Sequence, residues 1–479
     1  MENIPALVKS FFLLLVACVA GASAAQHKGL WGRSSSRPGS NDKHFVLPTG
    51  QDKSSVRRSS ASGEFWHQHL DNAIYTNVAI SLKGYVGAAT DLNPPEMVES
   101  FKISGERVAN KSSVTDWAHD ETTGQVAMSR NSTICAGVLS NTDNRNMMVF
   151  AWDLASSHPE PLWAFKRTSA EAISIDVSRD GSLVLLADVE NLGSDAKWTV
   201  TVYNGRSEEV LVRYATEGRN QQLRAAALSD DGLYVAWVTR IISQESVENF
   251  NLTVTEYNPV KQSFGQQVVT ALDTNIQSMI VSSSAEFIAV QGYDNRTMLV
   301  LKVFRRADAD KLTYARHDLV ETPYPNDLVA MAFSPEGLYL ATTWINRDLN
   351  HNQLVVYDMR TQKQVFSYLY PVEHDGDFYD KPCSVAMSDH GEYVVVGSWG
   401  TKNKQPGTEQ VQVFKVGVQA PIFKHFIPGS ALSVDMVKTD TGKLYVVAGG
   451  KKNPADVLGE GGDLFMFEVN PAMVEQGPE

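Results

Sequence analysis

The chain has 479 residues, of which 43% are hydrophobic and 20% are charged, and its formal net charge is −13. These values are typical of a folded protein with a sizeable core, and they exclude extensive disorder. The charge is uneven, because residues 26–63 carry more basic than acidic side chains and the rest is strongly acidic. An acidic body repels phosphate backbones, so we expect no nucleic-acid partner.

The first 25 residues have the pattern of a cleavable signal peptide. Lys9 is followed by an apolar run of about eleven residues, too short for the roughly 20 residues of a membrane span. Ala22-Ser23-Ala24 fits the small-residue cleavage rule, and an uncleaved anchor is the alternative. We therefore expect a protein without a membrane span that is secreted to the extracellular space or resides in the lumen of the secretory pathway.

Residues 26–63 are rich in Ser, Arg and Gly without an apolar period, which predicts a flexible basic leader. Arg57-Arg58 is either a processing site or part of a solvated basic linker. Residues 64–470 are predicted to form one domain, and residues 471–479 a C-terminal tail.

A repeated strand pattern organises this domain. Eight short apolar strands recur, and their last residues are 48 to 54 residues apart: NVAIS (77–81), QVAMS (125–129), SIDVS (174–178), AAALS (225–229), SMIVS (278–282), AMAFS (330–334), SVAMS (384–388) and SVDMV (433–437). Most are followed by a turn such as SRDG, SDDG, SPEG or SDHG, in which Ser and Asp bond nearby backbone and Gly accepts a positive φ. Each first strand and its turn thus open a β-hairpin.

Third strands end in an aromatic-polar pair, as in Trp152-Asp153 and Tyr357-Asp358, and a fourth strand follows. With these repeats the chain resembles the WD40/YVTN β-propeller superfamily over nearly all of residues 76–470, although the Gly-His pair of standard WD40 repeats is missing. The resemblance implies an all-β fold, a β-propeller with blades of four antiparallel strands. We expect eight blades, with seven as the alternative, and a ring closed by FWHQH (65–69) beside the three-stranded last repeat.

Long polar loops between second and third strands are the expected binding region, because binding residues concentrate on loops held by a rigid frame. Aromatic residues near the start of these loops could stack on a ligand, or could pack between blades, and arginines that follow could anchor an anionic group. These candidate binding residues are Trp237, Arg240, Tyr293, Arg296, Trp344, Arg347 and Trp399.

The link EHDGDFYD is dense in oxygen ligands and could bind Ca²⁺ through Glu373, Asp375, Asp377 and Asp380. Its order does not match an EF-hand, and a solvated acidic loop is the alternative. No other cofactor is expected. Four sequons make glycosylation candidates of Asn110, Asn131, Asn251 and Asn295, and Cys135 and Cys383 are expected to be buried thiols rather than a disulfide.

No hydrolase elbow or haem-attachment motif occurs in the sequence. We therefore predict a non-catalytic binding scaffold that presents its long-loop face to a protein or glycan ligand. The alternative is a secreted propeller enzyme, a lactonase-like hydrolase with loop carboxylates and a metal at the mouth of the ring, because a catalytic set can be assembled from separate loops.

Overall fold

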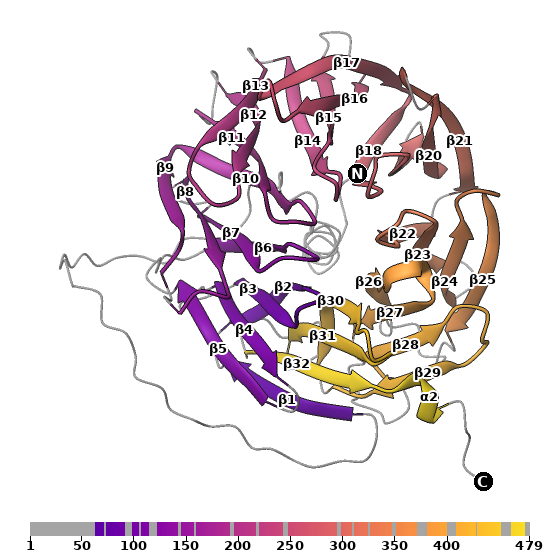
Figure 1. Ribbon diagram of the computed structural model, residues 1–479. Coiled ribbons are helices and arrows are strands. Elements are labelled where there is room, and N and C mark those ends of the chain that lie inside the picture. Colours follow the sequence, from indigo (N-terminus) through magenta and orange to yellow (C-terminus); the bar gives the residue numbers. More distant parts are fainter. Residues whose placement is uncertain are drawn as a thin grey trace, which may run out of the picture.

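The computed structural model describes residues 63–70, 73–91, 98–104, 107–114, 122–141, 145–157, 160–191, 196–216, 220–242, 248–294, 298–308, 311–323, 326–346, 351–370, 381–399, 409–427, 429–451 and 461–474. Within these ranges the chain forms eight blades of four antiparallel strands around one axis, as the sequence predicts (Figure 1). Blades 1 and 2 are joined into one sheet by a pair between Asp91 and Thr123.

The blades follow one another in chain order. Blade 1 contains β2 (Ile74–Ile80), β3 (Tyr85–Asp91), β4 (Val98–Ser104) and β5 (Arg107–Val114), and blade 2 contains β6 (Thr122–Met128), β7 (Ile134–Asn141), β8 (Asn146–Asp153) and β9 (Trp163–Thr168). Blade 3 contains β10 (Ala170–Val177), β11 (Leu183–Glu190), β12 (Lys197–Asn204) and β13 (Val210–Ala215), and blade 4 contains β14 (Gln221–Leu228), β15 (Tyr234–Ile242), β16 (Glu248–Asn258) and β17 (Ser263–Leu272).

Blade 5 contains β18 (Thr274–Val281), β19 (Phe287–Asp294), β20 (Met298–Asp308) and β21 (Lys311–Pro323), and blade 6 contains β22 (Asn326–Phe333), β23 (Tyr339–Asn346), β24 (His351–Asp358) and β25 (Lys363–Tyr370). Blade 7 contains β26 (Pro382–Met387), β27 (Tyr393–Ser398), β28 (Val411–Lys415) and β29 (Pro421–His425). Blade 8 contains β30 (Ser430–Lys438), β31 (Leu444–Lys451), β32 (Gly462–Val469) and β1 (Gly63–Leu70). A 3-10 turn (Asp389–Gly391) and a short helix, α2 (Pro471–Val474), complete the described elements.

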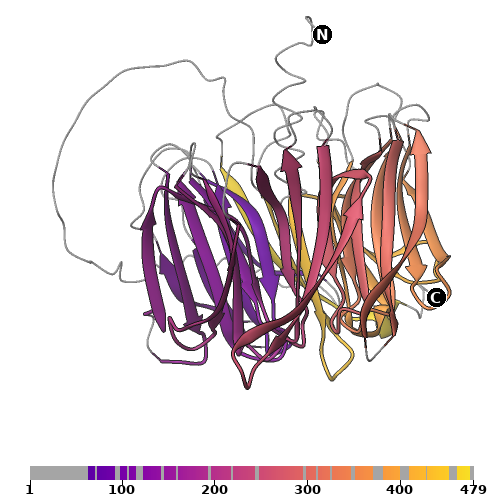
Figure 2. The ribbon, with the colours of Figure 1, turned by 90° about the horizontal axis from the view of Figure 1, so that it is seen from above.

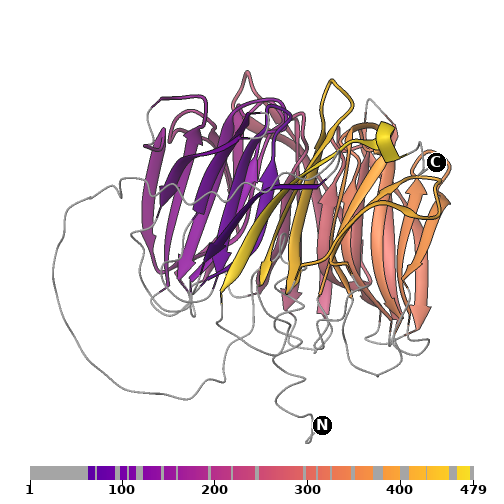
Figure 3. The ribbon, with the colours of Figure 1, turned by 90° about the horizontal axis from the view of Figure 1, so that it is seen from below.

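Two faces of the ring follow from this order. The turns between first and second strands lie on the same side as those between third and fourth strands, and we call this side the turn face. It is the lower side in Figure 2 and the upper side in Figure 3. The opposite side, the loop face, carries the connections between second and third strands and between blades. Most loop-face connections lie outside the described residues.

The recurring serine at the end of the first strand has a structural role in the turn. In blade 3 the amide of Leu183 donates to Ser178 Oγ at 3.0 Å, and the amide of Ser178 donates to the carbonyl of Leu183. The same pair of bonds joins Ser388 to Tyr393 in blade 7. The hydroxyl therefore closes the hairpin, which explains why serine recurs at this position.

The turn glycine sets the spacing between neighbouring blades. Gly181 has a φ of +72°, which favours glycine, and a Cβ at this position would lie 2.7 Å from Ile134 Cγ1 of blade 2. Gly391 is similar, because its Cβ would lie 2.3 Å from the Tyr339 ring of blade 6. Each of these turns therefore packs directly on the preceding blade.

Blades are apolar on both faces because each is covered by two neighbours. All eight residues of β7 are buried, and so are all six of β27. This explains the nearly continuous apolar sequence of the second strands. The thiols of Cys135 and Cys383 are buried as predicted, and no disulfide is present in the described residues.

The ring is closed by β1, as predicted from FWHQH. This strand pairs with β32 from Gly63 opposite Glu468 to Leu70 opposite Gly462. The indigo and yellow strands therefore lie side by side in Figure 1. Among the described residues, no helix is long and apolar enough to cross a membrane.

Candidate functional site

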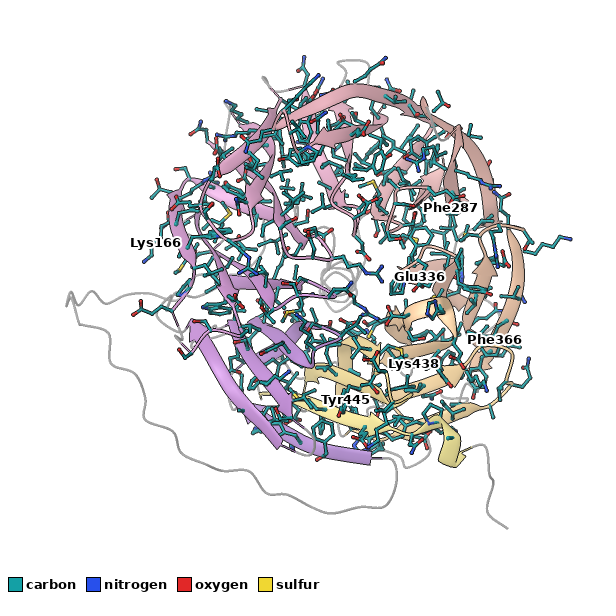
Figure 4. The ribbon with its side chains drawn as sticks, viewed as in Figure 1. Lys166, Phe287, Glu336, Phe366, Lys438 and Tyr445 are labelled. Carbon is teal, nitrogen blue, oxygen red and sulfur yellow. The ribbon has the colours of Figure 1, made fainter. Side chains whose placement is uncertain are left out.

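Charged side chains from five blades meet near the axis on the turn face. In four of the turns, the residue that follows the hairpin serine is charged: Arg130 in blade 2, Arg179 in blade 3, Asp230 in blade 4 and Asp389 in blade 7. Figure 4 shows the neighbouring turn residue Glu336 on the inner side of the ring and Lys166 at its outer rim. The turns therefore bring these charges together although they are far apart in sequence.

Asp389 accepts contacts from two arginines across the ring. Arg130 Nη2 donates to Asp389 Oδ2 at 3.2 Å, and Arg179 Nη2 lies 3.6 Å from Asp389 Oδ1. Blades 3 and 7 are opposite each other in a ring of eight, so the pair between Arg179 and Asp389 spans the axis. The Asp389 side chain is only 14% exposed, which makes this a largely desolvated contact.

Arg130 also contacts blade 8. Its Nη1 donates to the carbonyl of Met436 at 3.0 Å and lies 4.0 Å from Asp435 Oδ1. The Nε atoms of Arg130 and Arg179 and Oδ1 of Asp389 are buried and have no hydrogen-bond partner among the described residues. The site thus combines close ion pairs with three buried polar atoms that form no hydrogen bond among the described residues.

Two carboxyl groups on inner strands complete the set. Asp176 Oδ2 accepts the amide of Leu228 in blade 4 at 3.1 Å, and Asp435 Oδ2 accepts the amide of Ile80 in blade 1 at 2.8 Å. Each carboxyl therefore bridges two neighbouring inner strands. We call Arg130, Arg179, Asp176, Asp230, Asp389 and Asp435 the axial cluster.

Burial shifts the pKa values of three of these carboxyls upward. It raises the pKa of Asp176 to about 7, against the opposing effect of the amides of Leu228 and Val177. Burial also raises the pKa of Asp230, although Arg179 and Arg130 act against it. The pKa of Asp435 is raised by burial too, with Arg130 opposing. Within the axial cluster, Asp176 is therefore a carboxyl that binds a proton near neutral pH.

Backbone hydrogen bonds between turns support the axial cluster. The amide of Asn131 donates to the carbonyl of Arg179, and the amide of Arg179 donates to the carbonyl of Asp230 at 2.6 Å. The amide of Leu82 likewise donates to the carbonyl of Arg130. These bonds join the turns of blades 1 to 4, so the charged side chains stand on a connected frame.

The sequence analysis did not select the axial cluster, yet the sequence carries a signal for it. Two residues before the repeat end, five first strands have alanine, as in NVAIS and AMAFS, whereas SIDVS and SVDMV have Asp176 and Asp435. An ionisable side chain replaces a small one there in two repeats. An alignment of the eight first strands would have shown both aspartates at this position.

The tryptophans proposed as binding residues are packed inside the ring. Trp237 is fully buried, with its ring 4.7 Å from Tyr214 of blade 3 and 6.1 Å from Phe264. Trp344 is 8% exposed, and its Nε1 donates to Thr342 Oγ1 at 2.7 Å. Trp399 is 2% exposed, with Lys451 Nζ 5.7 Å from its ring. All three indoles contribute to packing, and a binding role for them stays a prediction.

The remaining candidates of that set are divided between described and undescribed residues. Tyr293 is half-buried at the end of β19, and Arg240 Nη1 lies 3.5 Å from Gln222 Oε1 on the neighbouring strand. Side chains of Arg296 and Arg347 lie outside the described residues, as do Glu373, Asp375, Asp377 and Asp380 of the acidic link. Calcium binding by that link stays a prediction. Within the described ranges, no group of three or more His, Cys, Asp or Glu side chains could hold a metal ion.

Two of the four sequon asparagines have described side chains. Asn131 is exposed in the turn beside Arg130, and Asn251 is half-buried within β16. Asn110 lies in β5 with its side chain outside the described set, and Asn295 lies outside the described residues. Glycosylation at these positions stays a prediction.

No family model matches the chain, and no curated protein matches it in sequence. Solved structures do match in fold. The Saccharomyces cerevisiae protein Sqt1 matches with a TM-score of 0.53 and 10% identity, covering 86% of this chain and 99% of its own. The Dos1 propeller matches with a TM-score of 0.52 and 12% identity, covering 85% and 95%. The chain has the WD40-type propeller fold.

A peptidase also shares this fold. Prolyl oligopeptidase B from Galerina marginata matches with a TM-score of 0.52 and 12% identity, over 79% of this chain and 56% of that one. A large part of the peptidase therefore has no counterpart in the match. At these identities the likeness shows the WD40-type propeller fold alone, and the axial cluster must be interpreted from its own geometry.

Proposed function

We propose that this WD40-type propeller is a secreted, non-catalytic scaffold that binds a protein partner on its turn face. The observation that carries the proposal is the combination of the axial cluster with exposed apolar side chains on the same face of the ring. Four turn-face residues have large exposed apolar side chains: Leu162 (42%), Leu233 (39%), Val260 (92%) and Val418 (41%). Leu233 belongs to the turn between the first and second strands of blade 4. The other three belong to turns between the third and fourth strands of blades 2, 4 and 7, so all four lie on the same face as the axial cluster.

Exposed apolar side chains on the same face as fixed charges suit a protein partner. Apolar residues supply the contact area that is removed from water, and charged groups set the orientation and the rate of encounter. The backbone bonds between the turns fix the charges before binding, which lowers the entropic cost of association. Sqt1 and Dos1 have the same fold, and this supports a scaffold without identifying its partner.

Features of the amino-acid sequence support the remaining parts of the proposal. The apolar run after Lys9 and the Ala22-Ser23-Ala24 pattern favour export. Asn131 is exposed in the blade 2 turn, which is compatible with a glycan at this position. A glycan ligand and the lactonase-like hydrolase are the alternatives, and the measurements described below distinguish them.

The test uses chemical crosslinking in extracellular fluid, with the full chain as bait and mass spectrometry as the readout. The variant Leu233→Asp/Val260→Asp places charges on the turn face, and Val365→Asp is the control on the outer strand β25, where Val365 is 44% exposed. We expect a partner that crosslinks to turn-face residues and binds the double variant at least about tenfold more weakly, a loss of about 1.4 kcal/mol. The control variant is expected to bind as the wild type does.

Three outcomes would contradict the proposal. One is a partner that binds both variants equally, which would place the binding surface elsewhere. The second is turnover of an ester, lactone or peptide panel by the purified chain, which would favour the hydrolase. The third is binding of the chain to glycans on an array without binding to any protein, which would make the ligand a glycan.

A further inference from the structure

The strand β1 is attached to three blades by polar contacts. It pairs with β32 of blade 8, and its Gln68 and Glu64 reach side chains of blades 1 and 7. Trp66 packs 5.1 Å from Phe101 of blade 1, measured between ring centroids. Figure 3 shows the indigo β1 against the yellow β32 at this seam. The contacts of β1 thus determine how firmly the ring is closed.

Three histidines of the seam face carboxylates. His67 Nε2 and His69 Nδ1 lie 2.8 Å and 2.7 Å from the same atom, Asp463 Oδ1. Asp463 is only 8% exposed, whereas the histidine side chains are 39% and 28% exposed. On the neighbouring blade, His425 Nε2 lies 3.4 Å from Glu64 Oε2 of β1. Protonation of any of these imidazoles turns a neutral contact into an ion pair.

The other face of β1 holds a buried carboxyl. Gln68 Nε2 donates to Glu99 Oε2 at 2.9 Å and to Tyr75 Oη at 3.0 Å, and Tyr75 Oη donates to Glu99 Oε2 at 2.7 Å. Tyr75 is fully buried and Glu99 is 6% exposed. Burial raises the pKa of Glu99 despite these two donors. The fold therefore favours the protonated form of Glu99.

The hydrogen bond to Asp463 raises the pKa of His67 above its ordinary value, against the effect of burial. A raised histidine pKa gives stability that is complete below the unfolded value and is lost as the pH rises through the folded one. Glu99 acts in the same direction, because its raised pKa also favours the folded state at lower pH. Among the described residues, the titratable groups that contact β1 or belong to it are Asp463, Glu64, Glu99, Tyr75, Tyr445, His425 and the two histidines of β1 itself.

We propose that β1 is a pH-sensitive clasp of the ring. It is held firmly in mildly acidic solution through the contact of His67 with Asp463, and it loosens at the outer edge of blade 8 as the solution becomes alkaline. Stacking of the His67 ring on Phe465, with centroids 4.4 Å apart and an interplanar angle of 5°, keeps the imidazole beside Asp463 in both protonation states. The clasp therefore acts through charge and not through movement of this ring.

The test measures hydrogen exchange of the full chain by mass spectrometry between about pH 5.5 and about pH 8. The readout is a ratio of two opening equilibrium constants, that of residues 63–70 divided by that of β31. Each constant is corrected for the chemical exchange rate at that pH. We expect the ratio to rise about tenfold over this range, which corresponds to one pKa unit of differential protonation. In His67→Gln/His69→Gln we expect the rise to be about threefold or less.

His390→Gln is the matched control. His390 Nδ1 lies 3.2 Å from Glu336 Oε1, so it is also a histidine beside a carboxylate, but it belongs to a turn of blade 7. This variant is expected to keep the full pH response of β1. A ratio that does not change with pH in the wild type, or an unreduced rise in the double variant, would overturn the proposal.

A second measurement applies if the double variant does not fold. The imidazole C2 proton of His67 is titrated by NMR in the wild-type chain. A His67 pKa above the ordinary value of about 6.5 supports the clasp. A value at or below 6.5 overturns it, because Asp463 would then not favour the charged imidazole.

Discussion

Arg179 Nη2 of blade 3 lies 3.6 Å from Asp389 Oδ1 of blade 7, which stands on the opposite side of the ring. An ion pair between opposite blades places both side chains at the axis. It connects two blades that are not neighbours in the ring and whose strands do not pair. Arg130 reaches the same carboxylate from blade 2. Asp389 therefore balances two guanidinium charges at one point of the turn face.

Asp389→Asn should destabilise the fold, because it leaves Arg130 and Arg179 close together without their shared counter-ion. The contact is largely buried, so we expect a loss of about 2 kcal/mol in the free energy of unfolding, measured by urea titration. Asp440→Asn is the control, since Asp440 is an exposed residue of the blade 8 turn. Equal effects of the two variants would show that the cross-axis pair contributes nothing to stability.

Much of this fold could be predicted from sequence, because strands and turns are local. In blades 2 to 7 the serine at the end of the first strand bonds backbone five residues away, as Ser178 does with Leu183, so the repeat is visible in a short window. The axial cluster could not be read in the same way. Arg179 and Asp389 are 210 residues apart, and only ring closure brings them together.

The candidate aromatic residues show a second limit of sequence reasoning. Trp237 lies at a blade interface, and its burial depends on Tyr214 of the preceding blade and Phe264 of its own. A strand sequence does not state which face meets a neighbouring blade and which end meets solvent. The repeat alone therefore located the strands but not the exposure of their aromatic side chains.

Gly181→Ala should be more destabilising than Gly442→Ala. Both glycines have positive φ, +72° and +82°, so alanine is strained at either position by about 1 kcal/mol. At Gly181 the new methyl would also lie 2.7 Å from Ile134 Cγ1, whereas nothing lies within 4 Å at Gly442. We expect the difference to be about 1 to 3 kcal/mol in urea unfolding. A similar loss of unfolding free energy at both positions would mean that blades 2 and 3 accommodate the new methyl group without loss of stability.

Arg167→Ala should destabilise the fold, because it removes the partner of a buried carboxylate between blades 2 and 3. Arg167 Nη1 donates to Asp188 Oδ2 at 2.6 Å and to Glu190 Oε1 at 2.9 Å, and its Nη2 donates to Tyr203 Oη at 2.6 Å. The Asp188 side chain is fully buried, so we expect a loss of about 3 kcal/mol in thermal or urea unfolding.

Lys166→Ala is the matched control for this variant, because Lys166 is the exposed neighbour at the outer rim (Figure 4). Arg167→Met/Asp188→Leu provides a second comparison, since it removes the buried carboxylate together with its partner, and Arg213 still pairs with Glu190. We expect this double variant to be more stable than Arg167→Ala. A double variant that is less stable would show that the pair itself, and not the uncompensated carboxylate, dominates the energy.

The fold should be more stable at about pH 5.5 than at about pH 8. Burial raises the pKa of Asp176 to about 7 and that of Asp188 to about 6, where Arg167 opposes the rise. The folded chain then binds more protons than the unfolded chain across this interval, so stability falls as the pH rises through these values. The urea midpoint measured at both pH values tests the direction.

Asp176→Asn identifies the axial cluster as one source of this pH dependence. The variant removes a proton-binding group and should reduce the difference in urea midpoint between the two pH values, while the amide oxygen can still accept from Leu228. Asp180→Asn is the control four residues along the chain. Burial there acts upward, but hydrogen bonds from Ser182 and Ser178 outweigh it and hold the pKa of Asp180 below its usual range. Asp180 does not titrate in this interval, so a reduced pH difference in Asp180→Asn, or an unchanged one in Asp176→Asn, would contradict the assignment.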